Sequence, residues 1–229
     1  MDAALRPIAD DLWVAERPLR RPLPFWDIGT RMTVIRLPGG GLFLHSPVGA
    51  DAATRRAVDA LGAVRAIVAP NYVHHLFAGG WKQAYPQARL LGAPGLARKR
   101  SDLAFDGELG DQPDPSYAEA IEQVFVRGAG LLNEVAFLHR ASRTLLLADL
   151  AFHPTAASRP GLRLWTRLTR VRHGFGPNGL VRLAIRDRRA ARASLDRILA
   201  WDFDRVTVTH GELLESGGRE ALRRAYAWL

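Results

Sequence analysis

Hydrophobic positions in the first part of the chain predict strands that alternate with helices. Runs that are apolar throughout, or that alternate with polar residues, predict strands at 12–19, 31–48, 63–70 and 88–94. The three glycines at 39–41 divide the second run into the two strands of a hairpin. Helical spacing of apolar residues predicts helices at 51–62 and 77–86. This alternation is typical of an α/β layered domain.

The second part of the chain predicts further strands, followed by helices. Apolar runs predict strands at 122–128, 134–140, 144–152 and 205–210, and helices are predicted at 161–172, 186–201 and 217–229. The turn-rich stretch at 106–117 is predicted to be a surface loop. No repeat, low-complexity tract or linker divides the sequence, so we expect one domain over residues 1–229.

The composition describes a globular protein and excludes several kinds of site. Hydrophobic residues make up 48% of the chain, and there is no cysteine, which excludes disulfides, thiolate metal ligands and cysteine nucleophiles. The first residues lack the apolar core of a secretory signal. No apolar run approaches the roughly 20 residues of a membrane-spanning helix. The expected location is therefore the cytoplasm.

Positive charge is concentrated between Ser158 and Ala200, where eleven arginines stand against two aspartates. This excess matches the net charge of +9 of the whole chain. A GC-rich genome, an anionic small-molecule substrate, a membrane surface and a nucleic acid could each account for it. Nucleic-acid recognition ranks last, because Trp165 and Phe175 are the only aromatic residues between 161 and 176 that could stack on bases.

A basic amphipathic helix is predicted inside this segment. Apolar residues repeat at helical spacing beside a stripe of arginines: Leu164, Leu168 and Val171, with Arg163, Arg167 and Arg170. On one interpretation the helix packs on the core through its apolar stripe. On the other it is a lid whose arginines and Trp165 shape a pocket for an anionic substrate, or it is a face that contacts a membrane.

Four polar residues stand where predicted strands end. His74 and His75 follow AIVAP, Asp149 follows TLLLA, and His210 follows VTVT. Ligands of open α/β sheets bind beyond the carboxyl ends of strands, so these side chains could meet in one place. Imidazoles with a carboxylate suit Zn²⁺, Fe or Mn²⁺. Each residue alone could instead cap a helix or form a turn, but four together favour a metal site.

The order of these segments resembles the metallo-β-lactamase-like superfamily, which includes lactamases, glyoxalase II-type thioesterases and lactonases. Within it, the chain is similar to a family of unknown function, DUF4336, through RMTVIRLPGGGLFLHSPV, IVAPNYVHHLF, EVAFLHRASRTLLLADL and WDFDRVTVTHGELLESGGREALRRAYAWL. The likeness covers nearly the whole chain. It implies a four-layer αββα sandwich with a metal at one edge between two sheets, and with a helical insertion near residues 158–200.

The sequence departs from the HxHxDH signature of that superfamily. When the final pair is placed on His74 and His75, Pro70 and Tyr72 stand at the first two histidine positions. Gly130 stands at the histidine that normally opens the later strand pair. The first metal position of the superfamily has therefore lost its histidines. The resemblance implies one divalent metal ion, preferably zinc with iron or manganese as alternatives, held by His74, His75, Asp149 and His210.

Three further residues are candidates for a supporting role. Glu134 could accept a hydrogen bond from a ligand histidine, or act as a catalytic base. His45 and Ser46 end the second hairpin strand near the same edge and could support a ligand. The remaining histidines are assigned no role: His139, which is predicted to be exposed, His153 and His173.

These expectations together describe a metal-dependent hydrolase that acts on a small molecule with an ester, thioester, lactone or similar bond. Asp149 would bind the metal and orient the attacking water. Two alternatives stay open: a non-catalytic metal- or ligand-binding protein on the same scaffold, and an iron-dependent redox enzyme. Neither the substrate nor the oligomeric state is indicated by the sequence.

Overall fold

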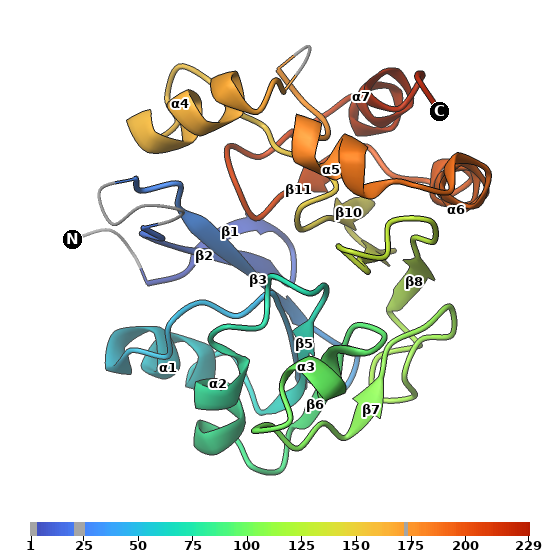
Figure 1. The fold of residues 1–229 in the computed structure, drawn as a ribbon. Coiled ribbons are helices and arrows are strands. Elements are labelled where there is room, and N and C mark those ends of the chain that lie inside the picture. Colours follow the sequence, from blue (N-terminus) through green and yellow to red (C-terminus); the bar gives the residue numbers. More distant parts are fainter. Residues whose placement is uncertain (1–3, 21–25, 172–173) are drawn as a thin grey trace.

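In a computed structural model, which describes residues 4–20, 26–171 and 174–229, two β-sheets pack face to face between two layers of helices (Figure 1). Apolar side chains from both sheets form one buried cluster between them. Two further clusters join each sheet to its own helices. The predicted four-layer αββα sandwich is confirmed.

The larger sheet has its strands in sequence order, from β1 to β7. Neighbours are antiparallel from β1 to β4 and parallel from β4 to β7. The strands are β1 (Arg6–Ala9), β2 (Leu12–Arg17), β3 (Thr30–Arg36), β4 (Leu42–His45), β5 (Val64–Ala69), β6 (Arg89–Gly92) and β7 (Gly107–Glu108). Because β4 and β5 are parallel neighbours, their carboxyl ends lie at one edge of the sheet.

The smaller sheet has the strand order β11-β10-β9-β8. Its strands are β8 (Ile121–Phe125), β9 (Val135–His139), β10 (Thr144–Leu146) and β11 (Arg205–Thr207). The first three form an antiparallel meander, and β11 is parallel to β10. The carboxyl ends of β10 and β11 therefore also lie together, and the chain continues from them into the 147–150 and 208–211 loops.

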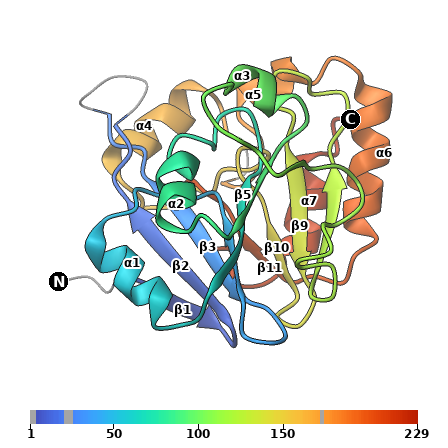
Figure 2. The same cartoon turned by 90° about the horizontal axis from the view of Figure 1, so that it is seen from below.

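Helices cover the outer face of each sheet. Those beside the larger sheet are α1 (Ala52–Asp59), α2 (Ala78–Ala84) and α3 (Leu96–Lys99); those beside the smaller sheet are α4 (Pro160–Leu168), α5 (Gly179–Ala184), α6 (Arg188–Leu199) and α7 (Gly218–Ala225). Figure 2 shows α1 and α6 on opposite sides of the molecule. Aspartates cap both helices, because Asp51 accepts from the Thr54 N–H and Asp187 accepts from the Ala190 N–H.

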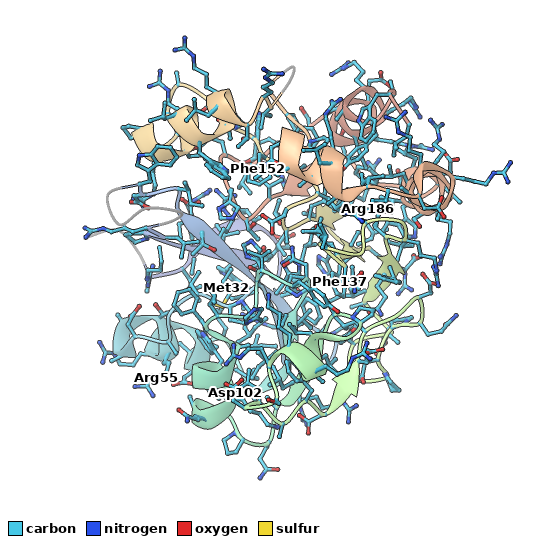
Figure 3. All side chains as sticks on the ribbon, in the orientation of Figure 1. Met32, Arg55, Asp102, Phe137, Phe152 and Arg186 are labelled. Carbon is cyan, nitrogen blue, oxygen red and sulfur yellow. The ribbon has the colours of Figure 1, made fainter. Side chains whose placement is uncertain are left out.

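Strand β5 shows why a continuous apolar run lies at the centre of the fold. Ala66 and Val68 face the space between the sheets, whereas Ile67 and Ala69 face the helices. A strand that is buried on both faces reads as an unbroken hydrophobic run. Phe137 of β9 fills the same inter-sheet space and lies near the centre of the molecule (Figure 3).

Four short elements were not predicted from the sequence. These are β1, α3, α5 and β7, which lies inside the stretch 106–117 that we expected to be a loop. Each has six residues or fewer. Neither the helical period of 3.6 residues nor the strand alternation of two can be recognised over so short a length without a marked apolar pattern, so tertiary contacts decide these elements.

The basic helix α4 packs in a different orientation from the one that its apolar stripe predicts. Leu164 and Leu168 are 43% and 59% exposed, and the buried residues are Leu162 and Thr166. The interpretation that the helix packs through the Leu164–Leu168 stripe is therefore wrong. The predicted helix at 161–172 ends at Leu168, and its residue 172 lies outside the described residues, as does His173.

No helix among the described residues has the length and apolar character that crossing a bilayer requires.

Candidate metal centre

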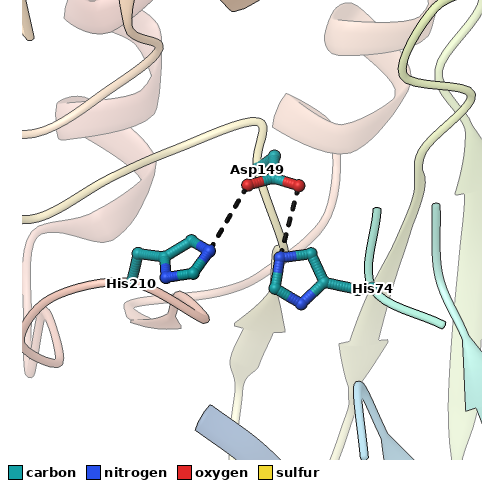
Figure 4. A group of neighbouring side chains, drawn as sticks. All are labelled: His74, Asp149 and His210. Carbon is teal, nitrogen blue, oxygen red and sulfur yellow. Dashed lines mark ion pairs between the residues drawn. The ribbon is translucent and has the colours of Figure 1, made fainter. Parts of the chain in front are cut away.

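Three side chains from separate loops meet at the edge between the sheets. Asp149 lies between two imidazoles, with its Oδ2 at 3.3 Å from His74 Nε2 and its Oδ1 at 3.6 Å from His210 Nε2 (Figure 4). All three residues are buried, and their potential ligand atoms lie within 4.8 Å of one another. Two imidazole nitrogens and one carboxylate oxygen form a donor set that suits a divalent transition metal.

The outer nitrogen of each imidazole is held by the protein. His210 Nδ1 donates to the Gly29 carbonyl at 2.7 Å, which leaves the Nε2 lone pair free on the inner side. His74 Nδ1 lies 2.8 Å from the Ser46 hydroxyl. Metal-binding histidines are typically oriented by such a contact at the second nitrogen. Ser46 takes the expected supporting position, in a left-handed conformation with φ of 53° that is unusual for serine.

Asn71 shapes the loop that carries His74. Its Oδ1 accepts from the backbone N–H groups of Val73 and His74 at 2.8 and 2.7 Å, which forms a tight polar turn after β5. Its Nδ2 donates to Asp149 Oδ2 at 2.9 Å and to Glu134 Oε2 at 2.8 Å. One buried amide therefore fixes two of the three candidate ligands. Sequence reasoning missed Asn71, although its place between a buried strand and His74 is a signal.

Glu134 holds the backbone of the loop that carries Asp149. Its carboxylate accepts from the N–H groups of Ala148 and Asp149, both at 2.7 Å, and more weakly from that of Leu150. It is fully buried and does not line the cavity described below. No hydrogen bond joins it to a described histidine, so its contacts are those of a positioning residue. Burial, and then the charge of Asp149, raise the pKa of Glu134 to about 7.

The loop after β11 is fixed from both sides of His210. The buried Arg31 guanidinium donates to the carbonyls of Val208 and Gly211, and it also pairs with Glu16 at 2.9 Å. Gly211 has φ of 107°, and a Cβ there would lie 2.2 Å from the His153 carbonyl oxygen. Only glycine fits this position without a shift of the backbone, which explains why a glycine directly follows His210.

Charge is distributed unequally over the two histidines. Burial would lower the pKa of His74, but the charge of Asp149 beside it raises the pKa above its ordinary value. Burial and the neighbouring His74 lower the pKa of His210 to about 4. Burial would raise the pKa of Asp149, but the charge of His74 and its hydrogen bond lower it to about 2. The carboxylate is therefore ionised throughout the physiological range.

The structure does not bring His75 into this group. His75 Nδ1 accepts a hydrogen bond from Arg100 Nη1 at 2.8 Å, on the side of α3. Burial, and then the charges of Lys99 and Arg100, lower the pKa of His75 to about 4. Among the described residues, the group that could hold a metal contains His74, Asp149 and His210 without His75. The two adjacent imidazoles therefore have different partners, Asp149 for His74 and Arg100 for His75.

A cavity of about 520 Å³ opens onto the three side chains. Most of its wall is apolar, with contributions from Ile28, Leu132, Phe152 and Trp165. This volume is in the range of small-molecule sites. Apart from the candidate ligands, the only charged lining residue among those described is Arg186.

The other residues singled out from the sequence lie elsewhere. Arg163 and Arg167 line a separate hollow on the outer side of α4, and Gly130 lies exposed beside the cavity-lining Leu131. The prediction that His139 is exposed is wrong, because it is buried with its Nδ1 2.8 Å from the Ser142 hydroxyl. Sequence reasoning also missed Thr209, whose hydroxyl lies 3.3 Å from His74 Nε2.

We expect metal binding near neutral pH to release a proton from His74. The raised pKa means that this imidazole carries a proton in the metal-free protein just above pH 6.5, whereas a ligand imidazole must be neutral. Affinity for Zn²⁺ should therefore rise with pH above 6.5. His210, with a pKa of about 4, contributes no proton in this range. Calorimetric titration in two buffers of different ionisation enthalpy measures the release, and identical heats in both would contradict it.

Comparison with solved structures identifies the fold. The metallo-β-lactamase DIM-1, in a crystal exposed to ceftazidime, has a TM-score of 0.66 and 13% identity over 98% of this chain and 96% of that one. The mono-zinc form of the metallo-β-lactamase FIM-1 from Pseudomonas aeruginosa has a TM-score of 0.64 and 10% identity over 97% and 91%. No match was found among curated proteins.

A third similar structure is the metal-soaked flavodiiron core Flv1 from Synechocystis sp. PCC6803, with a TM-score of 0.67 and 13% identity. It covers 98% of this chain, which spans 60% of the flavodiiron chain. At these identities the likeness shows the fold alone. Residues 22–160, more than half of the chain, match the family described as a domain of unknown function, DUF4336. The chain therefore belongs to the DUF4336 family and has the metallo-β-lactamase fold.

Proposed function

We propose that this protein is a metal-dependent hydrolase with one divalent metal ion, which cleaves an ester, thioester, lactone or similar bond of a small molecule. The observation that carries the proposal is the convergence of His74, Asp149 and His210 at the floor of an open cavity. A structural metal is usually enclosed by four protein ligands, whereas a catalytic metal has three and keeps one position open. Three candidate ligands beside a cavity match the second arrangement.

The donor set fits zinc and also iron. Two histidines and one carboxylate occur at catalytic zinc sites and in the facial triad of Fe(II) enzymes. The contacts of His210 Nδ1 and His74 Nδ1 leave both Nε2 atoms facing Asp149. When bound, a divalent metal supplies Lewis acidity that polarises a carbonyl group and lowers the pKa of water.

Asp149, the apolar wall and Arg186 would position the attacking water and the substrate. Asp149 Oδ2 is held by Asn71 and His74, which leaves Oδ1 without a hydrogen bond from the described residues and able to accept one from the attacking water. The carboxylate stays ionised at neutral pH, because its pKa is about 2. A substrate that packs against the apolar wall would displace water from the floor, which would strengthen each polar interaction there. Arg186 gives the cavity a positive charge that favours an anionic substrate.

Metal analysis combined with turnover tests this proposal. The purified protein should hold about one equivalent of metal and should hydrolyse simple activated esters. A chelator should abolish turnover, and added Zn²⁺ should restore it. Two tightly held equivalents would overturn the single-metal site. Full activity after complete metal removal would overturn metal-dependent hydrolysis, and a protein that takes up no metal after reconstitution would favour a non-catalytic member of the fold.

Iron-dependent redox chemistry is the second candidate, and the two-histidine, one-carboxylate donor set is the observation that favours it. The metal itself discriminates between the two candidates. Iron as the main metal after purification, with oxygen consumption and no ester hydrolysis, would favour the redox enzyme.

A further inference from the structure

The wall of the cavity differs sharply from its floor. The floor carries the three polar candidate ligands, whereas the wall rises through apolar side chains to the surface. Deep in the cavity these are Ile28, Leu132 and Phe152, which are all buried. These side chains have no hydrogen-bonding groups, so a polar group of a ligand that is buried against them loses its hydrogen bonds to water without replacement. An apolar part of a ligand does not pay this cost.

The mouth of the cavity is also apolar, although it is exposed to solvent. Leu131, Leu180 and Leu183 are 68%, 53% and 76% exposed, and all three line the cavity. Val73 and Leu76 are 51% and 40% exposed and line the cavity as well. Clusters of exposed large apolar side chains mark binding sites, because their burial is gained only when a ligand covers them. Apolar side chains therefore line the cavity both beside its floor and at its mouth.

Polar groups on the wall are few: Thr30, the Trp165 indole, Asn178 and Arg186. The Asn178 side chain caps α5 by accepting from the Val181 N–H at 2.9 Å. Arg186 lies two residues after the end of α5 and is exposed (Figure 3). No ion pair joins its side chain to an acidic residue in the described part of the chain. Between the floor and this arginine, the wall offers few places for hydroxyl or amide groups of a substrate. A sugar, a nucleotide or a polar peptide would leave its polar groups unpaired here.

We propose that the cavity binds an acyl chain, so that the substrate is an ester, thioester or lactone whose carbonyl carries a straight apolar tail. The substrate class rests on the proposed hydrolase, whereas binding of the tail does not. The carbonyl lies at the floor beside Asp149, and the tail extends along the wall to the exposed leucines of α5. A volume of about 520 Å³ accommodates a tail of roughly eight carbons or more, since a group the size of water takes about 30 Å³.

Binding is tested without turnover by neutral straight-chain alcohols of increasing length, from butanol to decanol. They displace a fluorescent apolar dye, anilinonaphthalene sulfonate, from the metal-loaded protein. Affinity should rise about three- to fourfold for each added methylene, the gain expected for full burial of a CH₂ group. An affinity that does not change with chain length would overturn the acyl-chain site.

Two leucine variants locate the binding. Leu183→Asp places a charge on the cavity rim and should weaken binding of the longest alcohol at least tenfold, with no loss of folding because Leu183 is exposed. Leu168→Asp is the matched control, since Leu168 is an exposed helical leucine outside the cavity lining. It should leave binding unchanged. Equal weakening by both variants would place the chain elsewhere and overturn the proposal.

Turnover of p-nitrophenyl esters from acetate to decanoate separates the two proposals. If both hold, kcat/KM should rise with chain length and should fall in Leu183→Asp for the long esters only. Chain-length-dependent binding of alcohols without any ester hydrolysis would support the acyl site and count against the hydrolase. Hydrolysis at the same kcat/KM for all lengths would support the hydrolase and overturn the acyl site.

Discussion

His74→Ala should abolish metal retention, whereas His75→Ala should leave it intact. His74 Nε2 lies 3.3 Å from Asp149 Oδ2 within the candidate ligand group, but His75 turns away and accepts from Arg100. Loss of residues that only support ligands costs about 10- to 100-fold in metal affinity, so loss of a ligand should cost more than about a hundredfold. The two variants form a matched pair, because both remove a buried imidazole from the same loop.

Metal content of the dialysed proteins, measured by mass spectrometry, checks this expectation. Asp149→Ala and His210→Ala should behave like His74→Ala, because each removes one of the three converging donors. Circular dichroism distinguishes loss of metal from loss of fold. Metal loss in His75→Ala, with its fold unchanged, would show that binding turns the His75 side chain away from Arg100 and would restore the four-ligand site implied by the superfamily signature.

The location of the candidate metal site could be predicted from the sequence more accurately than the identity of each ligand. That polar residues follow β5, β10 and β11 could be predicted, since strand ends follow from hydrophobic runs and parallel strands share an edge. It could not be predicted from the sequence which of His74 and His75 points toward Asp149. Adjacent side chains point in different directions in a regular strand or helix, but in a loop their directions depend on local contacts. Here those contacts involve Asn71 at the His74 backbone and Arg100 at the His75 side chain. No sequence pattern marks Asn71, and Arg100 lies 25 residues beyond His75.

The same limit applies to the helices beside the cavity. The alternation of strands and helices follows from the period of hydrophobic residues and was predicted, whereas the four layers were implied by the resemblance to the metallo-β-lactamase-like superfamily. The orientation of α4 was not predicted, because its period allows Leu164 and Leu168 to face either the core or the solvent. In the structure, the face of α4 that carries Leu162 and Thr166 packs against the core. The short elements β1, α3, α5 and β7 also were not predicted, since their formation depends on neighbouring segments rather than on periodicity.

Glu134→Ala should destabilise the protein more than most single substitutions. The change leaves the backbone N–H groups of Ala148 and Asp149 and one N–H of the Asn71 amide without their acceptor, in a region from which water is excluded. Each unsatisfied buried donor costs about 1–3 kcal/mol, so we expect a loss of about 3 kcal/mol or more in the free energy of unfolding. Urea denaturation measures the loss. The loop that holds Asp149 should loosen with it, so metal affinity should fall as well.

Two control variants test whether the loss of stability comes from the buried hydrogen bonds of Glu134 or from the removal of any carboxylate. Glu122→Ala on the neighbouring strand removes a carboxylate that pairs with Arg140 at the surface, and it should cost about 1 kcal/mol or less. Glu134→Gln keeps the shape and one acceptor oxygen but turns an NH₂ group toward backbone donors, so its loss should lie between the other two. If Glu134→Ala kept full stability and metal affinity while hydrolysis disappeared, the carboxylate would be a catalytic base and not the support of the Asp149 loop. Its complete burial and its hydrogen bonds to the backbone argue for the support.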